Sequence, residues 1–389
     1  DESGWIHFIA DLPIRAKYYL KEIYAPDGYV RATEAQEFTF EYQGDKTTQA
    51  VYEFTFENVQ TSVELSKADL TDGKELPGAS LQVLDSTGTV VEEWISTEEP
   101  HMIRGLLVGE TYTLVETKPA DGYTTAESIE FKVEDTAEVQ KHQMLDDVTK
   151  VEISKTDVTD SKEIPGAKLT ILDKDGKVVE SWVSDKDPHM VEKLPVGTYT
   201  LREEQAPDGY LVAEEVSFEV KDTGEIQKVE MKDARPTGKL ILKKTDAEDG
   251  SPLAGAEFEL RIKKSGKVVA TLVTDEEGVA TSGDIPIATY KDGKMKKEIE
   301  YILVETKAPD GYVRSEKEES VVFEYKDDKT KEIEITKELT NERIPTGGYV
   351  KSPKTGDDTN IWLPILLLVL SVGGIAGIFW YTKKKNHEE

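Results

Sequence analysis

Short runs in which apolar and polar residues alternate make up most of the chain. They are rich in Val, Ile, Thr, Tyr and Phe, and turn signals such as Pro77-Gly78 and Asp175-Gly176 separate them. Alternation of this kind predicts half-buried β-strands, and the Gly, Pro and Asp pairs predict the turns between strands. No segment before residue 360 shows an apolar period of 3.6 residues over three helical turns. We therefore expect an all-β fold for this part of the chain.

Two motifs recur at a long period. One joins a YxL sequence to a Glu and a Gly-Tyr pair, and begins at residues 18, 112, 199 and 301; the other places a Lys before a Gly-Ala pair, and begins at residues 66, 154 and 243. The lysines of the second motif are 88 and 89 residues apart, which suits an independent domain better than a solenoid repeat. Several short strands in such a unit predict a sandwich of two antiparallel sheets. We expect units at 62–149, 150–237 and 238–345, with 1–61 as the C-terminal part of a further unit whose opening strands are not in this sequence.

The C-terminal region has a different pattern. Residues 361–381 are 21 consecutive residues without a charge, and three lysines follow almost at once. Such a stretch predicts a transmembrane helix, and its basic flank, residues 382–389, belongs on the cytoplasmic side. A buried core helix is the alternative, although few core helices stay uncharged over this length. Residues 346–360 would form a linker between the last sandwich and the helix.

Alternation with period two also places polar residues on the apolar face of several predicted strands. In the opening strand of each complete unit a Lys shares the face of Val, Ile or Leu. A Glu shares the face of the Tyr and Leu in the YxL motif, and an Asp or Asn lies on the apolar face of the closing strand. These residues are Lys67, Glu116 and Asp146; Lys155, Glu203 and Asp233; and Lys244, Glu305 and Asn341; the first unit has Glu22 and Asn58 without a Lys.

A buried charged group destabilises the fold by several kcal/mol unless it is paired or neutralised. One interpretation of each trio is a buried ion pair with a hydrogen-bonded neighbour. The other is chemical. Burial favours the neutral forms of Lys and of carboxyl groups, and a neutral amine can attack the carbonyl carbon of Asp or Asn while a protonated Glu transfers protons. An amide bond between the two side chains would result.

The YxLxETxAPxGY motif, with a Lys in the opening strand and an Asp or Asn in the closing strand, resembles the Cna B-type or SpaA-type pilin domains of Gram-positive surface proteins. The resemblance covers nearly all of residues 1–345 and implies tandem prealbumin-like, Ig-like β-sandwiches with spontaneous intramolecular isopeptide bonds. By position it implies bonds Lys67–Asp146, Lys155–Asp233 and Lys244–Asn341, with Glu116, Glu203 and Glu305 as the catalytic groups. Glu22 and Asn58 would form a half-site.

Two positions leave a choice between neighbours. Asp147 competes with Asp146, and we prefer Asp146 because it shares a face with Met144. Lys243 competes with Lys244, and the step of 11 residues to the Gly-Ala pair, equal in all three units, favours Lys244. The KPADGY sequence that begins at residue 118 departs from the usual order of the motif, although its Tyr, Leu and Glu are intact.

Ser352, Pro353, Lys354, Thr355 and Gly356 precede the predicted helix and its basic tail. This order resembles a cell-wall sorting signal of the LPxTG type, with Ser in place of Leu. The resemblance implies that a sortase cuts between Thr355 and Gly356 and joins the threonine to peptidoglycan. The protein would then be a single-pass membrane intermediate that ends on the cell wall of a Gram-positive bacterium. A permanently membrane-embedded protein is the alternative.

Composition excludes several functions. The chain has 48 Lys and Arg against 78 Asp and Glu, a formal charge of -30, so nucleic acid is not an expected partner. With no Cys it forms no disulfide and no thiolate metal site. His101 and His189 lie one unit apart and are expected to pack near strand ends, while the acidic run at Asp173 predicts a hairpin turn. We expect no cofactor and no metal.

The sequence favours a wall-anchored stalk or adhesin, with a host or extracellular ligand bound through a region N-terminal to this sequence. The alternative is a pilus subunit polymerised by a sortase through a Lys, for which no YPK-type motif is present. A glycosidase is disfavoured because the glutamates lie on core faces rather than in a cleft. Apart from autocatalytic bond formation, we do not expect an enzyme.

Overall fold

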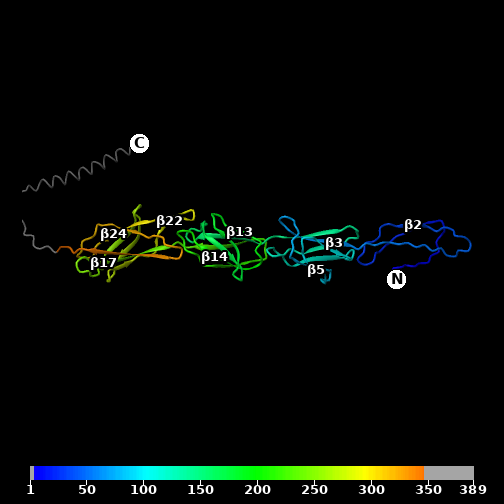
Figure 1. Cartoon of the computed structure of the whole chain (residues 1–389), viewed down its shortest axis with the longest axis horizontal. Helices are drawn as coiled ribbons and strands as arrows, with labels where there is room; N and C mark the ends of the chain where they lie inside the picture. Colours follow the sequence, from blue (N-terminus) through cyan, green and yellow to red (C-terminus); the bar gives the residue numbers. More distant parts are fainter. Residues whose placement is uncertain (1–3, 346–389) are drawn as a thin grey trace, which may run out of the picture.

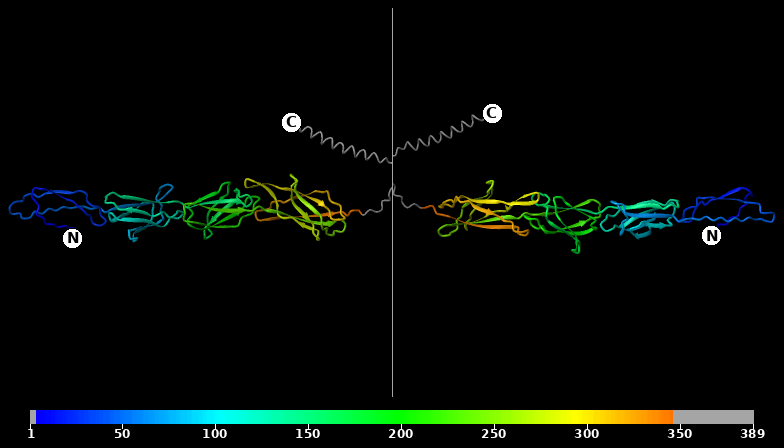
Figure 2. Two further views of the ribbon diagram at one scale, coloured as in Figure 1. Left: turned by 180° about the vertical axis from the view of Figure 1, so that it is seen from behind. Right: turned by 45° about the horizontal axis from the view of Figure 1, so that its top comes forward.

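The computed structural model describes residues 4–345, in which β-strands are the only regular secondary structure and turns and loops connect them. The all-β prediction is confirmed for this part of the chain. Four units, here called domains 1 to 4 (residues 4–61, 62–149, 150–237 and 238–345), follow one another in a row from the N-terminal end to the orange C-terminal end (Figures 1 and 2). The described residues include no helix long and apolar enough to cross a membrane. The predicted helix at 361–381, the basic tail and the SPKTG motif lie outside the described residues.

Domain 2 is a sandwich of two sheets. One sheet has the strand order β6-β3-β9 and the other the order β5-β4-β7-β8. The strands are β3 (Ser62–Asp69), β4 (Ser80–Leu84), β5 (Val90–Ile95), β6 (His101–Arg104), β7 (Thr111–Lys118), β8 (Ile129–Lys132) and β9 (Gln140–Asp146).

Domain 3 repeats this arrangement, with sheets β13-β10-β16 and β12-β11-β14-β15. Its strands are β10 (Lys150–Asp157), β11 (Lys168–Leu172), β12 (Val178–Val183), β13 (His189–Glu192), β14 (Gly197–Gln205), β15 (Val216–Val220) and β16 (Ile226–Asp233). The acidic run at Asp173 forms the predicted turn between β11 and β12. The Asp173 carboxylate accepts hydrogen bonds from the amides of Asp175 and Lys177, both at 2.9 Å, and Gly176 has a φ of 77°.

Domain 4 keeps the same two sheets and adds a hairpin, β22-β23. Its strands are β17 (Thr237–Asp246), β18 (Glu257–Ile262), β19 (Val268–Val273), β20 (Val279–Thr281), β21 (Ile285–Pro286), β22 (Ala288–Lys291), β23 (Lys294–Glu298), β24 (Glu300–Lys307), β25 (Glu319–Val322) and β26 (Glu332–Asn341). β26 pairs with β17, and the second sheet has the order β19-β18-β24-β25.

The opening and closing strands of each complete domain are parallel neighbours in one sheet. β3 pairs with β9, β10 with β16 and β17 with β26. The register is the same in all three pairs, so that the residue two positions after the buried Lys is opposite the Asp or Asn of the closing strand. In domain 2 this pair is Asp69 and Asp146. A pulling force therefore enters and leaves each domain through adjacent strands.

The apolar faces of the two sheets form the core of each domain. In domain 2, Val63, Leu65 and Met144 from one sheet pack in a cluster with residues such as Leu114 and Phe131 from the other. Full burial of side chains of this size stabilises a fold by about 1.5–3 kcal/mol each. The alternation read from the sequence thus places the core where it was expected.

Two predicted histidine positions pack as expected. His101 and His189 begin the edge strands β6 and β13 and stack on Trp94 and Trp182, with ring centroids 4.3 Å and 4.4 Å apart. Each also bonds a glutamate, His101 to Glu92 at 2.9 Å. Within residues 4–345 no group of three or more His, Asp or Glu side chains is arranged to hold a metal ion.

Domain 1 is the least complete unit. Its one strand pair joins β1 (Lys17–Leu20) to β2 (Gln36–Thr39), the counterparts of β7 and β8 in domain 2. The closing segment, residues 51–58, lies outside any ladder. Aromatic rings fill the space between these segments, with Phe38 and Phe54 4.7 Å apart.

Candidate functional site: buried lysine–carboxyl clusters

Domain 2 brings Lys67, Glu116 and Asp146 together inside the sandwich. Lys67 on β3 places its Nζ 2.8 Å from Glu116 Oε1 on β7, and it also contacts Asp146 Oδ1 on β9. The side chains are 2%, 0% and 0% exposed. The second Glu116 oxygen accepts the amide of Ala126 at 2.7 Å, which fixes the carboxyl between the two sheets. The cluster therefore holds an amine and two carboxyls in contact and out of water.

Domain 3 builds the same cluster from the equivalent strands. Lys155 Nζ lies 3.0 Å from Glu203 Oε2 and contacts Asp233 Oδ1, and all three side chains are almost fully buried. The Glu203 carboxyl also accepts a backbone amide, that of Ala213, at 2.7 Å. Independent repetition of the geometry in two domains shows that the local sequence specifies it.

Burial sets the protonation of these clusters. Loss of solvent raises the pKa of Asp146 to about 7, although the neighbouring Lys67 acts in the opposite direction. The pKa of Asp233 also rises to about 7 through burial, opposed by Lys155 and reinforced by the charge of Glu203. A buried aspartate that readily holds a proton has a more electrophilic carbonyl carbon than a carboxylate in water.

One oxygen of each cluster's Asp or Asn has no hydrogen-bond partner among the described residues: Asp146 Oδ2, Asp233 Oδ2 and Asn341 Oδ1. Oε1 of Glu116, Glu203 and Glu305 also lacks a hydrogen bond, although in domains 2 and 4 this atom faces the lysine amine. A buried polar atom without a partner destabilises a fold by about 1–3 kcal/mol, and native structures contain few of them. For the two aspartates, formation of an amide with the lysine would remove one of the carboxyl oxygens.

Domain 4 has the same three positions with a looser arrangement. Lys244 Nζ is 3.5 Å from Glu305 Oε1 and donates to the carbonyl of Thr340 at 2.9 Å. Asn341 Nδ2 donates to Glu305 Oε2 at 2.9 Å and to the Val313 carbonyl at 2.6 Å. Burial lowers the pKa of Lys244, which favours the neutral amine. The glutamate here contacts the side-chain amide that would leave as ammonia.

Domain 1 contains the half-site without an amine among the described residues. Asn58 Nδ2 donates to Glu22 Oε2 at 2.7 Å and to the Val30 carbonyl at 2.9 Å. Glu22 Oε2 also accepts the amide of Ala32 at 2.6 Å. These three contacts match those of Asn341 and Glu305 in domain 4, so the Glu–Asn pair takes the same geometry in an incomplete unit.

The two competing residues point elsewhere. Asp147 binds Lys150 at 2.8 Å near the surface, and Lys243 lies 3.3 Å from Glu338 with about half of its side chain exposed. Neither contributes to a buried cluster. The structure thus brings together the residues that alternation favours.

Sequence reasoning missed a Tyr–Asp pair in each complete domain, buried in domains 2 and 3 and partly buried in domain 4. The Tyr of the Gly-Tyr motif donates to an Asp two residues after the buried Lys: Tyr123 to Asp69 at 2.6 Å, Tyr210 to Asp157 at 2.8 Å and Tyr312 to Asp246 at 2.7 Å. Burial alone would raise the pKa of Asp69. The hydrogen bonds that Asp69 accepts from Tyr123, Thr71 and Lys193 instead hold its pKa well below the usual range. Alternation does place each Asp on the same face as its Lys. The Tyr partner comes from a loop, however, and alternation says nothing about its position.

Three complete domains match one family model. Residues 61–147, 149–235 and 238–339 match the SpaA prealbumin-like fold domain. The chain therefore belongs to the SpaA domain family, and the resemblance noted from the sequence is confirmed for the fold. A comparison with curated proteins finds no match.

Several solved structures are similar to this chain. The Bacillus anthracis TIE protein is 27% identical over 74% of this chain and 52% of its own, with a TM-score of 0.49. BcpA, the major pilin subunit of Bacillus cereus, is 19% identical over 73% of this chain and 99% of its own, with a TM-score of 0.41. A streptococcal ancillary pilin is 16% identical, with coverages of 73% and 99% and a TM-score of 0.30. The chain spans about half the length of the TIE protein structure.

Proposed function

We propose that this chain is a pilin-like surface stalk or adhesin shaft of a Gram-positive bacterium. In domains 2 to 4 an isopeptide bond joins the opening strand to the closing strand, and a sortase attaches the chain to peptidoglycan. The observation that supports the bonds best is the solvent-free contact between the lysine amine and the aspartate carboxyl in domains 2 and 3. An ion pair that leaves a buried oxygen without a partner is a poor final state.

The chemistry of the cluster is a condensation. In domain 2 the neutral amine of Lys67 attacks Cγ of Asp146, a C–N bond forms, and one carboxyl oxygen leaves with two protons as water. Glu116 donates a proton to the tetrahedral intermediate and accepts one from the nitrogen, so it ends as it began. In domain 4 the leaving group is ammonia from Asn341, and Glu305 already contacts the departing nitrogen.

The purpose of the bonds is mechanical. Because the bonded strands are parallel neighbours, a force applied along the chain passes from one to the other through the amide instead of shearing the sheets apart. In the chain-entropy model, closure of a loop of about 80 residues also removes about 4–5 kcal/mol of conformational freedom from the unfolded state. In a chain without cysteine, the amide bonds would thus stabilise each domain in the way that disulfides do in other proteins.

Anchoring rests on the residues after domain 4. The SPKTG motif, the apolar stretch and the lysines have the order that a sorting signal requires, with sortase and peptidoglycan as the partners. Thr355→Ala should abolish wall attachment and leave the protein in the membrane fraction. Wall attachment of the variant at the wild-type level would remove this part of the proposal.

Polymerisation into a pilus is the alternative function. It predicts a ladder of high-mass species in boiled wall extracts, which a stalk attached singly to peptidoglycan does not produce.

Intact-mass spectrometry of the purified chain tests the bonds directly. The condensation predicts a loss of about 18 Da for each Lys–Asp bond and about 17 Da for the Lys–Asn bond, since water or ammonia is released. Peptide mapping after proteolysis should recover the strands β3 and β9 as one branched peptide. An unshifted mass would refute the cross-links.

A further inference from the structure

In domains 1 to 3 the C-terminal end of the domain, here called its trailing end and formed by the turn at the Gly-Tyr motif, meets the facing end of the next domain, here called the leading end. Joints 1/2 and 2/3 use the same contacts. Thr61 donates to the Leu106 carbonyl at 2.7 Å, and Thr149 donates to the Leu194 carbonyl at 2.6 Å. The amide two residues after the motif Tyr binds an Asp of the next domain: Arg31 to Asp135 at 2.9 Å and Thr125 to Asp222 at 2.8 Å.

The motif glycine makes close approach possible at these joints. A Cβ placed on Gly28 would lie 2.6 Å from the Gly105 carbonyl oxygen, and one on Gly122 would lie 2.4 Å from the Lys193 carbonyl oxygen. Both glycines have positive φ, 78° and 87°. The trailing end is thus shaped to receive a backbone carbonyl.

Joint 3/4 uses the same surface for a different partner. Gly209 packs against Met295 of the added hairpin, and the amide of Val212 donates to the Asp328 carbonyl at 2.8 Å. Tyr290 from the hairpin donates to the Gly209 carbonyl at 2.6 Å and lies over the Arg235 guanidinium, 4.0 Å from the ring centroid. Each of the three internal trailing ends is therefore covered by a domain of the same family.

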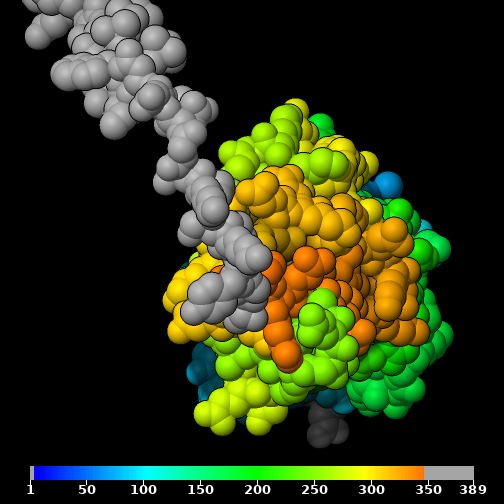
Figure 3. All heavy atoms as spheres, turned by 90° about the vertical axis from the view of Figure 1, so that its left-hand side faces the viewer, coloured from blue at the N-terminus to red at the C-terminus, as the bar shows by residue number. Residues whose placement is uncertain are grey.

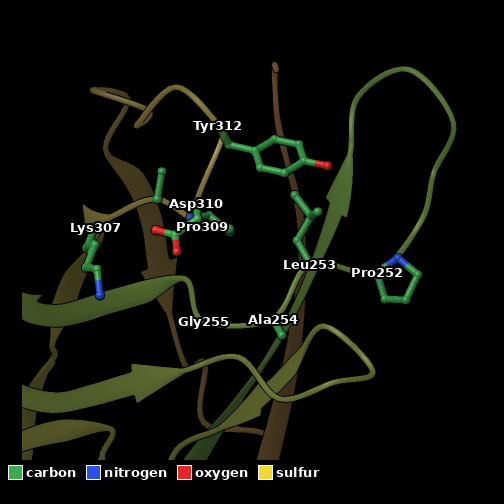
Figure 4. A pocket seen from close by; sticks show the side chains of 9 residues that line it. Pro252, Leu253, Ala254, Gly255, Lys307, Pro309, Asp310 and Tyr312 are labelled. Carbon is green, nitrogen blue, oxygen red and sulfur yellow. The ribbon is translucent and has the colours of Figure 1, made fainter. Parts of the chain in front are cut away.

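Domain 4 presents the same surface uncovered by any described residue. Around Gly311 a Cβ would meet nothing within 4 Å. Val313, which follows the motif Tyr, is 47% exposed, whereas its counterparts Val30, Thr124 and Leu211 are 6%, 8% and 8% exposed. Beside it lies a hollow of about 360 Å³ lined by Pro252 to Gly255, Lys307 to Asp310, and Tyr312 (Figure 4). Figure 3 shows the molecule with the domain 4 end facing the viewer.

We propose that the trailing end of domain 4 is a docking surface for the leading end of a SpaA-type domain of another molecule. The three occupied ends identify the kind of partner, since in each of them a domain of this family supplies the cover. Charge narrows the choice further. Arg314 occupies the position of Arg31, whose guanidinium lies 3.4 Å from Asp135. The fitting partner therefore presents an Asp beside a free backbone carbonyl, as the leading end of domain 2 does with Asp135 and Gly105.

The docking surface does not use the amide bonds. It borders the cluster of domain 4, since Arg314 donates to the Glu305 carbonyl at 3.1 Å and the Val313 carbonyl accepts from Asn341, but its turn, hollow and arginine contain none of the atoms that the bond would join. A failure of the docking test would leave the mass test of the cross-links unaffected, and the reverse also holds.

The test adds a fifth domain to the chain. A copy of residues 61–147 joined directly after Arg343 reproduces the step of three residues from Asn58 to Thr61 at joint 1/2. The chain has no Cys, so spin labels can be placed freely. One pair, at Thr271→Cys and at Glu93→Cys of the added copy, spans the new joint. The reference pair, Glu93→Cys and Ser181→Cys, spans joint 2/3 in the natural chain.

Pulsed dipolar spectroscopy then compares the two distance distributions. Docking predicts that the distribution across the new joint is as narrow as that across joint 2/3, and that Gly311→Asn broadens it several-fold. In the natural chain Gly311→Asn should leave the melting temperature nearly unchanged, because Asn tolerates positive φ and the added side chain meets open space. A broad distribution with either residue at position 311 would overturn the proposal.

Discussion

Domains 3 and 4 have a buried Lys, Glu and Asp or Asn at the same three positions, but the contacts among these side chains differ. In domain 3 the amine touches the carboxyl that it would attack, and Glu203 completes the contact at 3.0 Å. In domain 4 the amine lies 3.5 Å from Glu305 and is held by the Thr340 carbonyl, while the glutamate contacts the amide nitrogen of Asn341. The aspartate cluster is arranged for attack, and the asparagine cluster for departure of the leaving group.

The difference follows from charge. An aspartate and a lysine attract each other in a medium of low dielectric, so the pair closes without help. Asparagine offers a dipole only, and its Nδ2 donates to a carboxylate and a carbonyl rather than facing the amine. We infer that bond formation is faster in domains 2 and 3 than in domain 4, which time-resolved mass spectrometry of freshly refolded protein would detect as a loss of water before a loss of ammonia.

Removal of the amine should have the largest effect. Lys155→Ala removes the amine of the proposed cross-link in domain 3 and leaves two carboxyls buried without a cation. Breaking a buried pair destabilises a fold by about 3–5 kcal/mol, and loss of the covalent closure adds about 4–5 kcal/mol. Calorimetry should show domain 3 melting far below its neighbours or failing to fold.

Lys168→Ala, at the exposed first residue of β11, is the matched control. It should keep both the mass shift and the melting profile. Equal melting of the two variants would show that the buried lysine does not carry the stability of the domain.

Much of this arrangement could be predicted from the sequence, since period two decides which side chains face the core. Lys67, Glu116 and Asp146 were placed on core faces in this way before any contact was known. Alternation does not give register, however, so it could not show that Asp69 lies opposite Asp146 or that Tyr123 reaches it from a loop. The contacts between domains could not be predicted either. In the sequence Gly122 and Asp222 look like ordinary turn residues, and only the stacking of the domains shows that they lie at a joint. The hairpin β22-β23 lies between the repeated motifs of domain 4, so the motifs did not predict it.

Replacement of the glutamate should have the next largest effect. Glu203→Gln keeps the size of the side chain but removes its proton transfer, for which general acid–base catalysis typically accounts for a factor of about 10²–10⁴. The mass of domain 3 should stay unshifted for hours after refolding. Glu305→Gln tests the comparison, because Asn341 Nδ2 must take up a proton from Glu305 before it leaves as ammonia, and the variant should therefore block the bond in domain 4. Normal bond formation in both variants would remove the catalytic role.

The pH dependence separates the two clusters more finely. In Lys155→Met the hydrophobic volume is kept and no bond forms, while burial keeps the pKa of Asp233 above its usual value. A raised folded-state pKa gives stability that is full below the unfolded pKa of about 4 and is lost as pH rises through the folded pKa. Domain 3 of this variant should therefore melt at lower temperature at pH 7 than at pH 4.

Lys244→Met provides the contrast, because Asn341 does not titrate. The fall between pH 4 and pH 7 attributed to the aspartate should be absent from domain 4. The same slope in both domains would assign the effect to another group.

The smallest effect concerns Lys193, which joins domain 3 to the Asp–Tyr pair of domain 2. Its Nζ lies 2.6 Å from the Tyr123 hydroxyl and 3.2 Å from Asp69, and its φ is 62° where the equivalent residue of domain 2 is Gly105. A lysine in the left-handed region is strained by about 1 kcal/mol, and such strain persists where the side chain has a role.

Lys193→Gly should therefore relieve the strain and remove the half-exposed ion pair, two changes of similar size and opposite sign. We expect the melting temperature to shift by only a degree or two while the distance distribution between labels at Glu93→Cys and Ser181→Cys broadens. Lys193→Arg, which keeps the charge, should preserve the narrow distribution. If the distance distribution stays narrow in Lys193→Gly, the contacts of Thr149 and Thr125 alone are enough to fix the relative position of domains 2 and 3.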